Sequence, residues 1–208
     1  MSREIRFYVE GGGHLKATIV RFRTAMGNFL RSLREKARAK RIGWFIKACG
    51  GRRSAYDDFC AAVRSNPGAF NLLLVDAEGP VTCESPWEYL RTRPGDQWKN
   101  PGMEDQHCHL MVQTMEAWLI ADREKLAEYY GRDFHEKALP DNRNIEQIDK
   151  DAVARALRDA TRNTKKGEYH KTRHAPDILE RIRPAEVRAR ASYCERLFRT
   201  LSAQIDDA

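Results

Sequence analysis

A nearly continuous apolar run at residues 69–75 limits the fold of this chain more than any other feature. Such a run is typical of a strand that is covered on both faces. Residues 3–9, with a β-branched and aromatic bias, and residues 42–48 predict two earlier strands. Between these runs, residues 15–40 and 54–64 repeat apolar side chains at the three- and four-residue spacing of helices. The alternation of strands and helices predicts a parallel sheet with right-handed crossovers.

The remainder of the chain extends this pattern. Residues 79–108 are rich in Pro, Gly, Trp and polar side chains, which predicts an irregular loop with a short helix near 87–91. A fourth strand is expected at residues 109–114. Further helices are expected at residues 116–130, 145–162, 174–182 and 184–205, and Ser54 is the expected cap of the helix at 54–64.

The fold class that we expect is α/β, with a parallel sheet of about four strands flanked by helices. Residues 1–130 would form the α/β core, and residues 131–208 a helical extension packed on it as one compact unit. The 208 residues are enough to bury a sizeable core. No run approaches the roughly 20 apolar residues that cross a bilayer. Met1–Arg6 has no apolar signal core, so we expect a cytoplasmic location.

The charge of the chain favours a polyanionic partner. The net charge is +7, and residues 16–41 contain nine Lys and Arg residues against the single acid Glu35. A second basic segment spans residues 162–174. Basic side chains that neutralise phosphates release counterions, which favours binding to nucleic acid. The alternative for the first segment is a solvated basic face of a helix.

The cysteines and histidines give little support to a soft-metal site. Five cysteines form an odd set without a CxxC pair, which argues against both a disulfide framework and a zinc knuckle. His107, Cys108 and His109 are adjacent, but they are a poor signal for zinc because no partner pair accompanies them.

Acidic side chains follow three of the predicted strands. Glu10 closes the first, Asp76 and Glu78 follow the third, and Glu116 comes after the fourth. In an open α/β sheet, ligands bind outside the carboxyl ends of the strands. Carboxylate oxygens are the ligands that Mg²⁺ prefers. The four acids therefore predict a metal site at this edge, and the alternative for each acid alone is a turn or a helix cap.

Three glycines, Gly11, Gly12 and Gly13, directly follow Glu10. They can present backbone N–H groups to a phosphate at the start of the next helix. Alternatively, they simply permit a tight turn with positive φ. The glycines match neither GxGxxG nor the Walker motif, so support for a nucleotide site of either kind is weak.

Two of these strand ends resemble motifs of Toprim domains, which occur in topoisomerases, primases and overcoming-lysogenization-defect (OLD-type) nucleases. Val9–Gly11 is similar to their Glu motif and Leu74–Glu78 to their Asp-x-Asp motif, although Glu78 replaces the more usual second Asp. Over nearly its whole length the chain resembles a small Toprim-like bacterial family of unassigned function, often encoded beside an ATPase in phage-defence neighbourhoods. The segments that carry this closer resemblance are Tyr8–Gly11, Val75–Gly79, Met115–Asp122 and Tyr169–Pro176.

The resemblance implies Mg²⁺- or Mn²⁺-dependent hydrolysis of DNA or RNA, as an effector of a phage-defence module with an ATPase partner protein. Asp76 and Glu78 would be metal ligands. Glu10 would be a metal ligand or the general base toward water, and Glu116 would bind a second metal. Two ions can stabilise both the attacking and the leaving oxygen. No tyrosine can be assigned as a topoisomerase-like nucleophile, which favours hydrolysis.

The basic segment at residues 164–176 supplies further candidates, and we expect it to be a loop up to about residue 175. Lys171 would stabilise charge on the phosphate, and His174 would donate a proton. Arg173, Lys16 and the three glycines would contact the phosphates of the nucleic acid. The alternative is a solvated or helix-packing loop.

Two other functions fit the same residues. A non-catalytic Toprim-like module would dock on an ATPase without binding metal. A Mg²⁺-dependent phosphohydrolase would act on a small substrate, and nucleic acid would not compete for its site. The amphipathic segment at residues 187–201 would serve either the core or a homodimer.

Overall fold

The structure is a computed structural model that describes residues 4–208. At its centre is a sheet of four parallel strands in the order β2-β1-β3-β4. The strands are β1 (Glu4–Val9), β2 (Gly43–Ala48), β3 (Phe70–Asp76) and β4 (Cys108–Met111). The predicted α/β fold with a parallel sheet flanked by helices is confirmed. Residue 3, which we expected in the first strand, lies outside the described residues.

Ten α-helices and three short 3₁₀ helices accompany the sheet within residues 4–208. The first five α-helices are α1 (Lys16–Phe29), α2 (Arg31–Ala39), α3 (Arg52–Ser65), α4 (Pro86–Thr92) and α5 (Met115–Ala121). The others are α6 (Arg123–Tyr130), α7 (Lys150–Thr161), α8 (Lys171–Leu179), α9 (Pro184–Arg188) and α10 (Ser192–Asp206). The 3₁₀ helices are Asp105–His107, Glu136–Ala138 and Ile145–Gln147. None of the helices in the described part of the chain is both long and apolar enough to span a bilayer.

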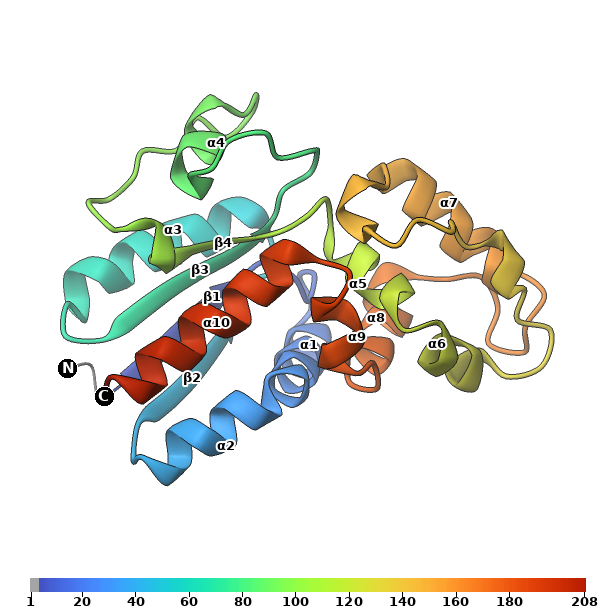
Figure 1. Cartoon of the computed structure of the whole chain (residues 1–208), viewed down its shortest axis with the longest axis horizontal. Helices are drawn as coiled ribbons and strands as arrows, with labels where there is room; N and C mark the ends of the chain where they lie inside the picture. The colour runs from blue at the N-terminus through green and yellow to red at the C-terminus, as the bar shows by residue number, and fades with distance from the viewer. Residues whose placement is uncertain (1–3) are drawn as a thin grey trace.

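Helices cover both faces of the sheet (Figure 1). Because side chains alternate between the faces of a strand, neighbouring residues of β1 join different clusters of buried residues. Phe7 packs in the cluster that contains Phe22 of α1 and Leu201 of α10, whereas Tyr8 packs in the cluster that contains Phe59 of α3. Every residue of β3 is buried, as its apolar sequence predicts.

The helices α5 to α9 gather at the carboxyl ends of the strands (Figure 1). Helix α8 packs against α1 there, and Arg21 forms an ion pair with Asp177. Helix α10 then returns along the sheet beside β4 and α2. Its residue Arg196 donates a hydrogen bond from Nη1 to the carbonyl oxygen of Cys108 at 2.8 Å. The C-terminal helices therefore close the region into which the strand ends point.

Three predicted helices are interrupted in the structure. The segment at residues 184–205 forms α9 and α10, with residues 189–191 between them. The segment at residues 15–40 forms two helices that meet at the fully buried Leu30. The segment at residues 116–130 is interrupted at Asp122, whose side chain accepts a hydrogen bond from the backbone N–H of Lys125 at 3.3 Å. An aspartate in this position caps a new helix, so the chain starts α6 there.

Four predicted boundaries are also wrong. The helix expected from residue 145 begins at Lys150 as α7, after the 3₁₀ helix Ile145–Gln147. Helix α3 begins at Arg52 with Gly51 at its cap position, so Ser54 is not a cap. The fourth strand is β4 at Cys108–Met111, one residue earlier and shorter than predicted. The segment at residues 164–176 is not a loop up to residue 175, because α8 starts at Lys171 and contains Pro176 in its interior.

Candidate metal centre

Three carboxylates meet where β1 and β3 end. Glu10 directly follows β1, Asp76 is the last residue of β3, and Glu78 lies two residues further along. One carboxylate oxygen from each side chain lies within 4.8 Å of the other two. The structure thus brings together the three acids that the sequence places after the first and third strands.

Hydrogen bonds to the backbone fix these acids relative to one another. The N–H of Glu10 donates to the carbonyl of Leu74 at 2.9 Å, which extends the pairing of the two strands. The N–H of Asp76 donates to Oε2 of Glu10 at 3.0 Å. Glu78 has a φ of 65°, and its N–H donates to the carbonyl of Gln113 at 2.7 Å. The chain therefore turns directly after β3 and keeps Glu78 beside the strand ends.

Asp76 is almost completely buried, and its Oδ1 accepts a hydrogen bond from the N–H of Met115 at 2.8 Å. Burial and the negative charge of Glu10, reinforced by Glu116, raise the pKa of Asp76 well above its ordinary value. Burial also raises the pKa of Glu10, although the charge of Arg52 opposes the rise. Because excess negative charge destabilises the ionised acids, a bound cation is favoured here.

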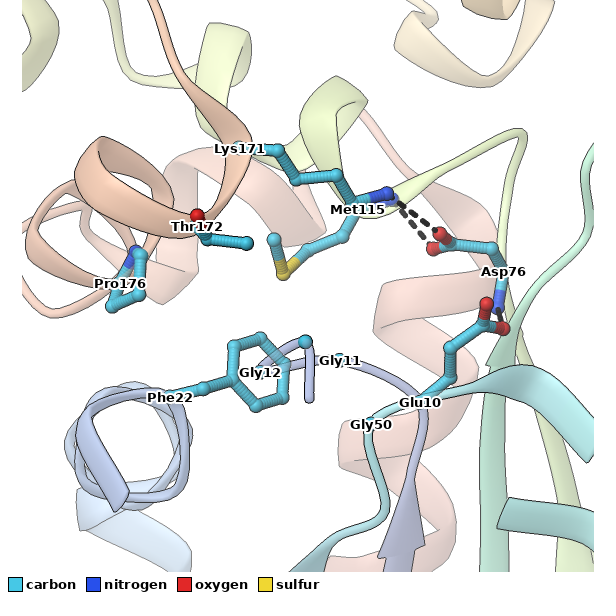
Figure 2. Close-up of a pocket in the computed structure, with 11 residues that line it drawn as sticks. Glu10, Gly11, Gly12, Phe22, Gly50, Asp76, Met115, Lys171, Thr172 and Pro176 are labelled. Carbon is cyan, nitrogen blue, oxygen red and sulfur yellow. Dashed lines mark hydrogen bonds and ion pairs between the residues drawn. The ribbon is translucent and has the colours of Figure 1, made fainter. Parts of the chain in front are cut away.

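Lys171 supplies positive charge from the first turn of α8. Its Nζ lies 3.6 Å from Oδ2 of Asp76 and 3.4 Å from Oε1 of Glu116 (Figure 2 draws the first pair). Burial disfavours the charged ammonium, but Asp76, Glu116 and Glu10 outweigh burial and raise the pKa of Lys171. Glu116 lies in the first turn of α5 and also accepts a hydrogen bond from the hydroxyl of Tyr169 at 3.2 Å. Lys171 therefore joins Glu116 to the cluster of three acids.

Arg52 is a site residue that the sequence reading missed. Its Nη1 lies 3.4 Å from Oε2 of Glu10 and also donates to the carbonyl of Asp76. Asp96 holds the guanidinium in place, with a 2.8 Å hydrogen bond from Nε. Arg52 follows β2 and two glycines, so the strand-end rule that identified the acids would also have identified this arginine.

Lys150 is a second missed residue. Its Nζ lies 2.6 Å from Oε2 of Glu78. Burial opposes ionisation of Glu78, but the hydrogen bond and charge of Lys150 outweigh burial and hold the pKa of Glu78 below its ordinary value. Lys150 begins α7, and no sequence pattern connects it to the strand ends. Tyr169 was likewise not identified as a site residue, although it lies within a motif of the resemblance.

The three glycines form a turn at the entrance to the site. Gly11, Gly12 and Gly13 have φ values of 136°, 91° and 65°, so the tight turn with positive φ is observed. Gly11 exchanges two backbone hydrogen bonds with Gly50, at 2.9 and 3.0 Å. Together with Glu10, Asp76 and Lys171, the glycines line a cavity of about 150 Å³ (Figure 2). Contact between the glycines and a phosphate stays a prediction.

The remaining predicted residues lie away from the acids. Lys16 is exposed at the start of α1, and Arg173 is exposed on α8. His174 is buried, and its Nδ1 lies 3.1 Å from the hydroxyl of Tyr130. The ring of Tyr169 contacts His174, while its hydroxyl reaches Glu116. His174 thus packs one helical turn beyond Lys171, and its role as a proton donor stays a prediction.

The donor set fits a hard divalent cation such as Mg²⁺ or Mn²⁺. Glu10, Asp76 and Glu78 offer only oxygen ligands, and they form the single cluster of three candidate ligands found within residues 4–208. His107 and His109 are used differently. Nδ1 of His107 lies 2.6 Å from the carbonyl of Asn71, and Nε2 of His109 lies 3.1 Å from that of Gln106. These histidines stabilise the backbone around β4.

Comparison with known proteins places the chain in a family. No curated protein matches it. Among solved structures, the C-terminal region of the Xanthomonas campestris pv. campestris OLD protein is similar, with 15% sequence identity and a TM-score of 0.49. That match covers 99% of this chain and 97% of the other. The family described as a domain of unknown function (DUF4276) matches residues 4–202. The chain therefore belongs to the DUF4276 family.

Proposed function

We propose that the protein hydrolyses phosphodiester bonds of nucleic acid with Mg²⁺ or Mn²⁺ bound at the carboxylate cluster, where Asp76 and Glu78 are ligands and Glu10 is a ligand or the general base. The observation that carries this proposal is the convergence of these three carboxylates at the ends of two adjacent parallel strands. The raised pKa of Asp76 and the nearby Lys171 add support. The Toprim-like motifs that contain the same acids favour hydrolysis of DNA or RNA.

Each side chain of the site has a separate role in the proposed reaction. Asp76 and Glu78 would hold the cation, which would supply positive charge beside the attacking and leaving oxygens. Glu10 uses Oε2 for its hydrogen bonds with Asp76 and Arg52, which leaves Oε1 to take a proton from water. Lys171 faces the acids and stabilises the negative charge that develops on the phosphate.

A second hollow, of about 380 Å³, shares Lys171 with the first cavity. Its lining includes the carboxylates of Glu78 and Glu116 and the basic side chains of Lys150 and Arg158. This arrangement suits a strand whose phosphates pass the acid cluster and contact basic side chains on the way. Glu116, hydrogen-bonded to Tyr169, is the ligand that we assign to a second ion.

The proposal is tested with purified protein and labelled DNA and RNA, each in single- and double-stranded form. We expect cleavage with Mg²⁺ or Mn²⁺ and none with EDTA. Glu10→Gln keeps the size of the side chain but removes the base, and we expect it to lower the rate by at least about 10²-fold. Glu128→Gln, on the exposed surface of α6, is the matched control and keeps the wild-type rate. Full activity in Glu10→Gln would contradict the assigned site.

The alternative functions give different results. A phosphohydrolase of small substrates would hydrolyse a phosphate monoester at a rate that DNA does not reduce. A docking module would bind no Mg²⁺ at millimolar concentration in calorimetry, and it would co-purify with an ATPase.

A further inference from the structure

The cavity beside the acid cluster has a mainly apolar end. Phe22 of α1, Met115 of α5 and Pro176 of α8 line this cavity, whose lining also includes Asp76 and Lys171. Figure 2 shows the Phe22 ring below the cavity, the thioether of Met115 above it, and Thr172 and Pro176 at its far side. Hydrolysis of a phosphodiester requires none of these apolar side chains, so this end of the cavity is available for another part of the substrate.

The glycine turn shapes this apolar end. A Cβ atom on Gly11 would lie 2.5 Å from Cζ of Phe22, so only glycine lets the ring pack against the turn. A Cβ atom on Gly13 would lie 3.3 Å from the methyl carbon of Thr172, so the turn also lies close to α8. The apolar end is therefore formed by four separate elements, namely the glycine turn, α1, α5 and α8.

The cavity also offers hydrogen-bond donors. Gly12 and Gly13 line it, and the backbone N–H of neither glycine donates to another group within residues 4–208. Unpartnered N–H groups beside an apolar wall suit a ring that carries acceptor atoms at its edge. A cavity of about 150 Å³ holds a six-membered aromatic ring in other proteins, and the cavity here has this volume.

We propose that this cavity holds one unstacked base, belonging to the nucleotide next to the phosphate at the acid cluster. The inference rests on the proposed function and narrows its substrate to strands with an unpaired nucleotide at the cleavage site. The ring of Phe22 and the thioether of Met115 contact the base. The volume favours a pyrimidine over the larger purine. A base inside a duplex is stacked and paired, and its extrusion costs free energy.

Binding of small probes tests the cavity without any cleavage. Thymidine 5′-monophosphate and deoxyribose 5-phosphate differ only in the base, and both are titrated into the protein in EDTA and followed by NMR. Stacking on an aromatic side chain predicts about tenfold tighter binding of the thymidine nucleotide. Equal affinities, or no binding of either probe at 10 mM, would overturn the proposal.

Variants test whether the residues of this cavity produce the preference for the thymidine nucleotide. Thr172→Phe fills the cavity from α8 and is expected to remove the preference for the thymidine nucleotide while leaving deoxyribose phosphate binding unchanged. Phe22→Leu keeps an apolar wall but removes the ring, so it is expected to reduce the preference at least about threefold. Thr24→Phe places the same new ring at an exposed position of α1 and is the matched control. A preference that survives Thr172→Phe in a protein that melts like the wild type would contradict the assignment.

Cleavage assays separate this inference from the function on which it rests. Single strands are expected to be cleaved at least about tenfold faster than duplexes, and an abasic nucleotide at the cleavage position is expected to slow cleavage by a similar factor. If metal-dependent cleavage occurs at the same rate on duplexes and on abasic strands, the proposed hydrolysis stands and the base pocket is rejected. Selective binding of the thymidine nucleotide without any cleavage would support the base pocket and contradict the proposed hydrolysis.

Discussion

Asp76 and Asp122 are both almost completely buried, but their surroundings are opposite. Asp122 accepts three hydrogen bonds from Arg183, from the backbone N and from Nε at 2.8 Å and from Nη2 at 2.7 Å. Burial opposes its ionisation, but these bonds hold the pKa of Asp122 below its ordinary value. For Asp76, burial and the charge of Glu10 raise the pKa.

We interpret Asp122 as a structural acid and Asp76 as the metal ligand of the proposed function. The charge of Asp122 is neutralised by Arg183 within the protein, so the side chain has no need of a ligand. Asp76 shares one lysine with other acids and lacks a matching number of positive charges. Both aspartates lie within segments that carry the Toprim-like resemblance, so the motif alone does not distinguish them.

The largest expected effect follows replacement of the functional acid. Asp76→Asn removes a metal ligand and is expected to lower metal-dependent cleavage by at least about 10³-fold. The same change relieves repulsion among buried acids, so the melting temperature in EDTA is expected to stay the same or to rise. Cleavage rates and thermal unfolding measure the two effects. A large loss of stability with little loss of rate would make Asp76 a structural acid like Asp122.

Metal binding gives the next largest effect. Mg²⁺ in about 100-fold excess over its Kd is expected to stabilise the wild type by about 2.7 kcal/mol. For a chain of this length that corresponds to a rise in Tm of roughly 5–10 °C. Asp76→Asn is expected to lose this rise, whereas Asp122→Asn keeps it. An equal rise in both variants would show that the ion binds elsewhere.

Replacement of the structural acid is expected to reduce stability. Asp122→Asn retains a cap for α6 but removes the buried carboxylate of Arg183 and leaves the arginine only its ion pair with the exposed Glu124. We expect this change to cost about 2 kcal/mol at pH 7. Because the folded state lowers the pKa of Asp122, its contribution is complete above the unfolded pKa of about 3.9 and is lost as the pH falls through the folded value. Urea unfolding at pH 7 and pH 3 should show the difference between wild type and variant shrinking. If the difference in unfolding free energy between wild type and variant grows toward pH 3, Asp122 does not stabilise the fold through its charge.

The smallest effect concerns the partly exposed pair of Lys150 and Glu78. Lys150→Gln is expected to change the unfolding free energy by less than about 1 kcal/mol, since exposed ion pairs contribute little. Its removal leaves Glu78 with less positive charge nearby, so Mg²⁺ should bind more tightly in calorimetry. Weaker Mg²⁺ binding in this variant would mean that Lys150 is needed to position Glu78.

Sequence patterns predicted the acidic residues at the strand ends much better than the basic residues that other helices bring to those acids. The apolar run before Asp76 determines where β3 ends, and parallel pairing then brings Glu10 beside Asp76. Lys150 reaches Glu78 and Arg183 reaches Asp122 through tertiary packing, which leaves no local pattern in the sequence.

The helix boundaries were harder to predict for a related reason. Apolar periodicity continues across Leu30 and Asp122, so it does not reveal the interruptions. The start of α8 was placed too late because the basic and polar residues before it, with Gly167, are typical of a loop. Pro176 lies inside α8, which starts at Lys171.

The most direct test of the metal centre is a crystal structure with Mn²⁺, recorded at the manganese absorption edge. We predict an anomalous peak coordinated by Asp76 and Glu78, with Glu10 as a ligand or hydrogen-bonded to a metal-bound water. No peak at these acids with millimolar Mn²⁺, or a peak at His107 and His109 instead, would contradict the account.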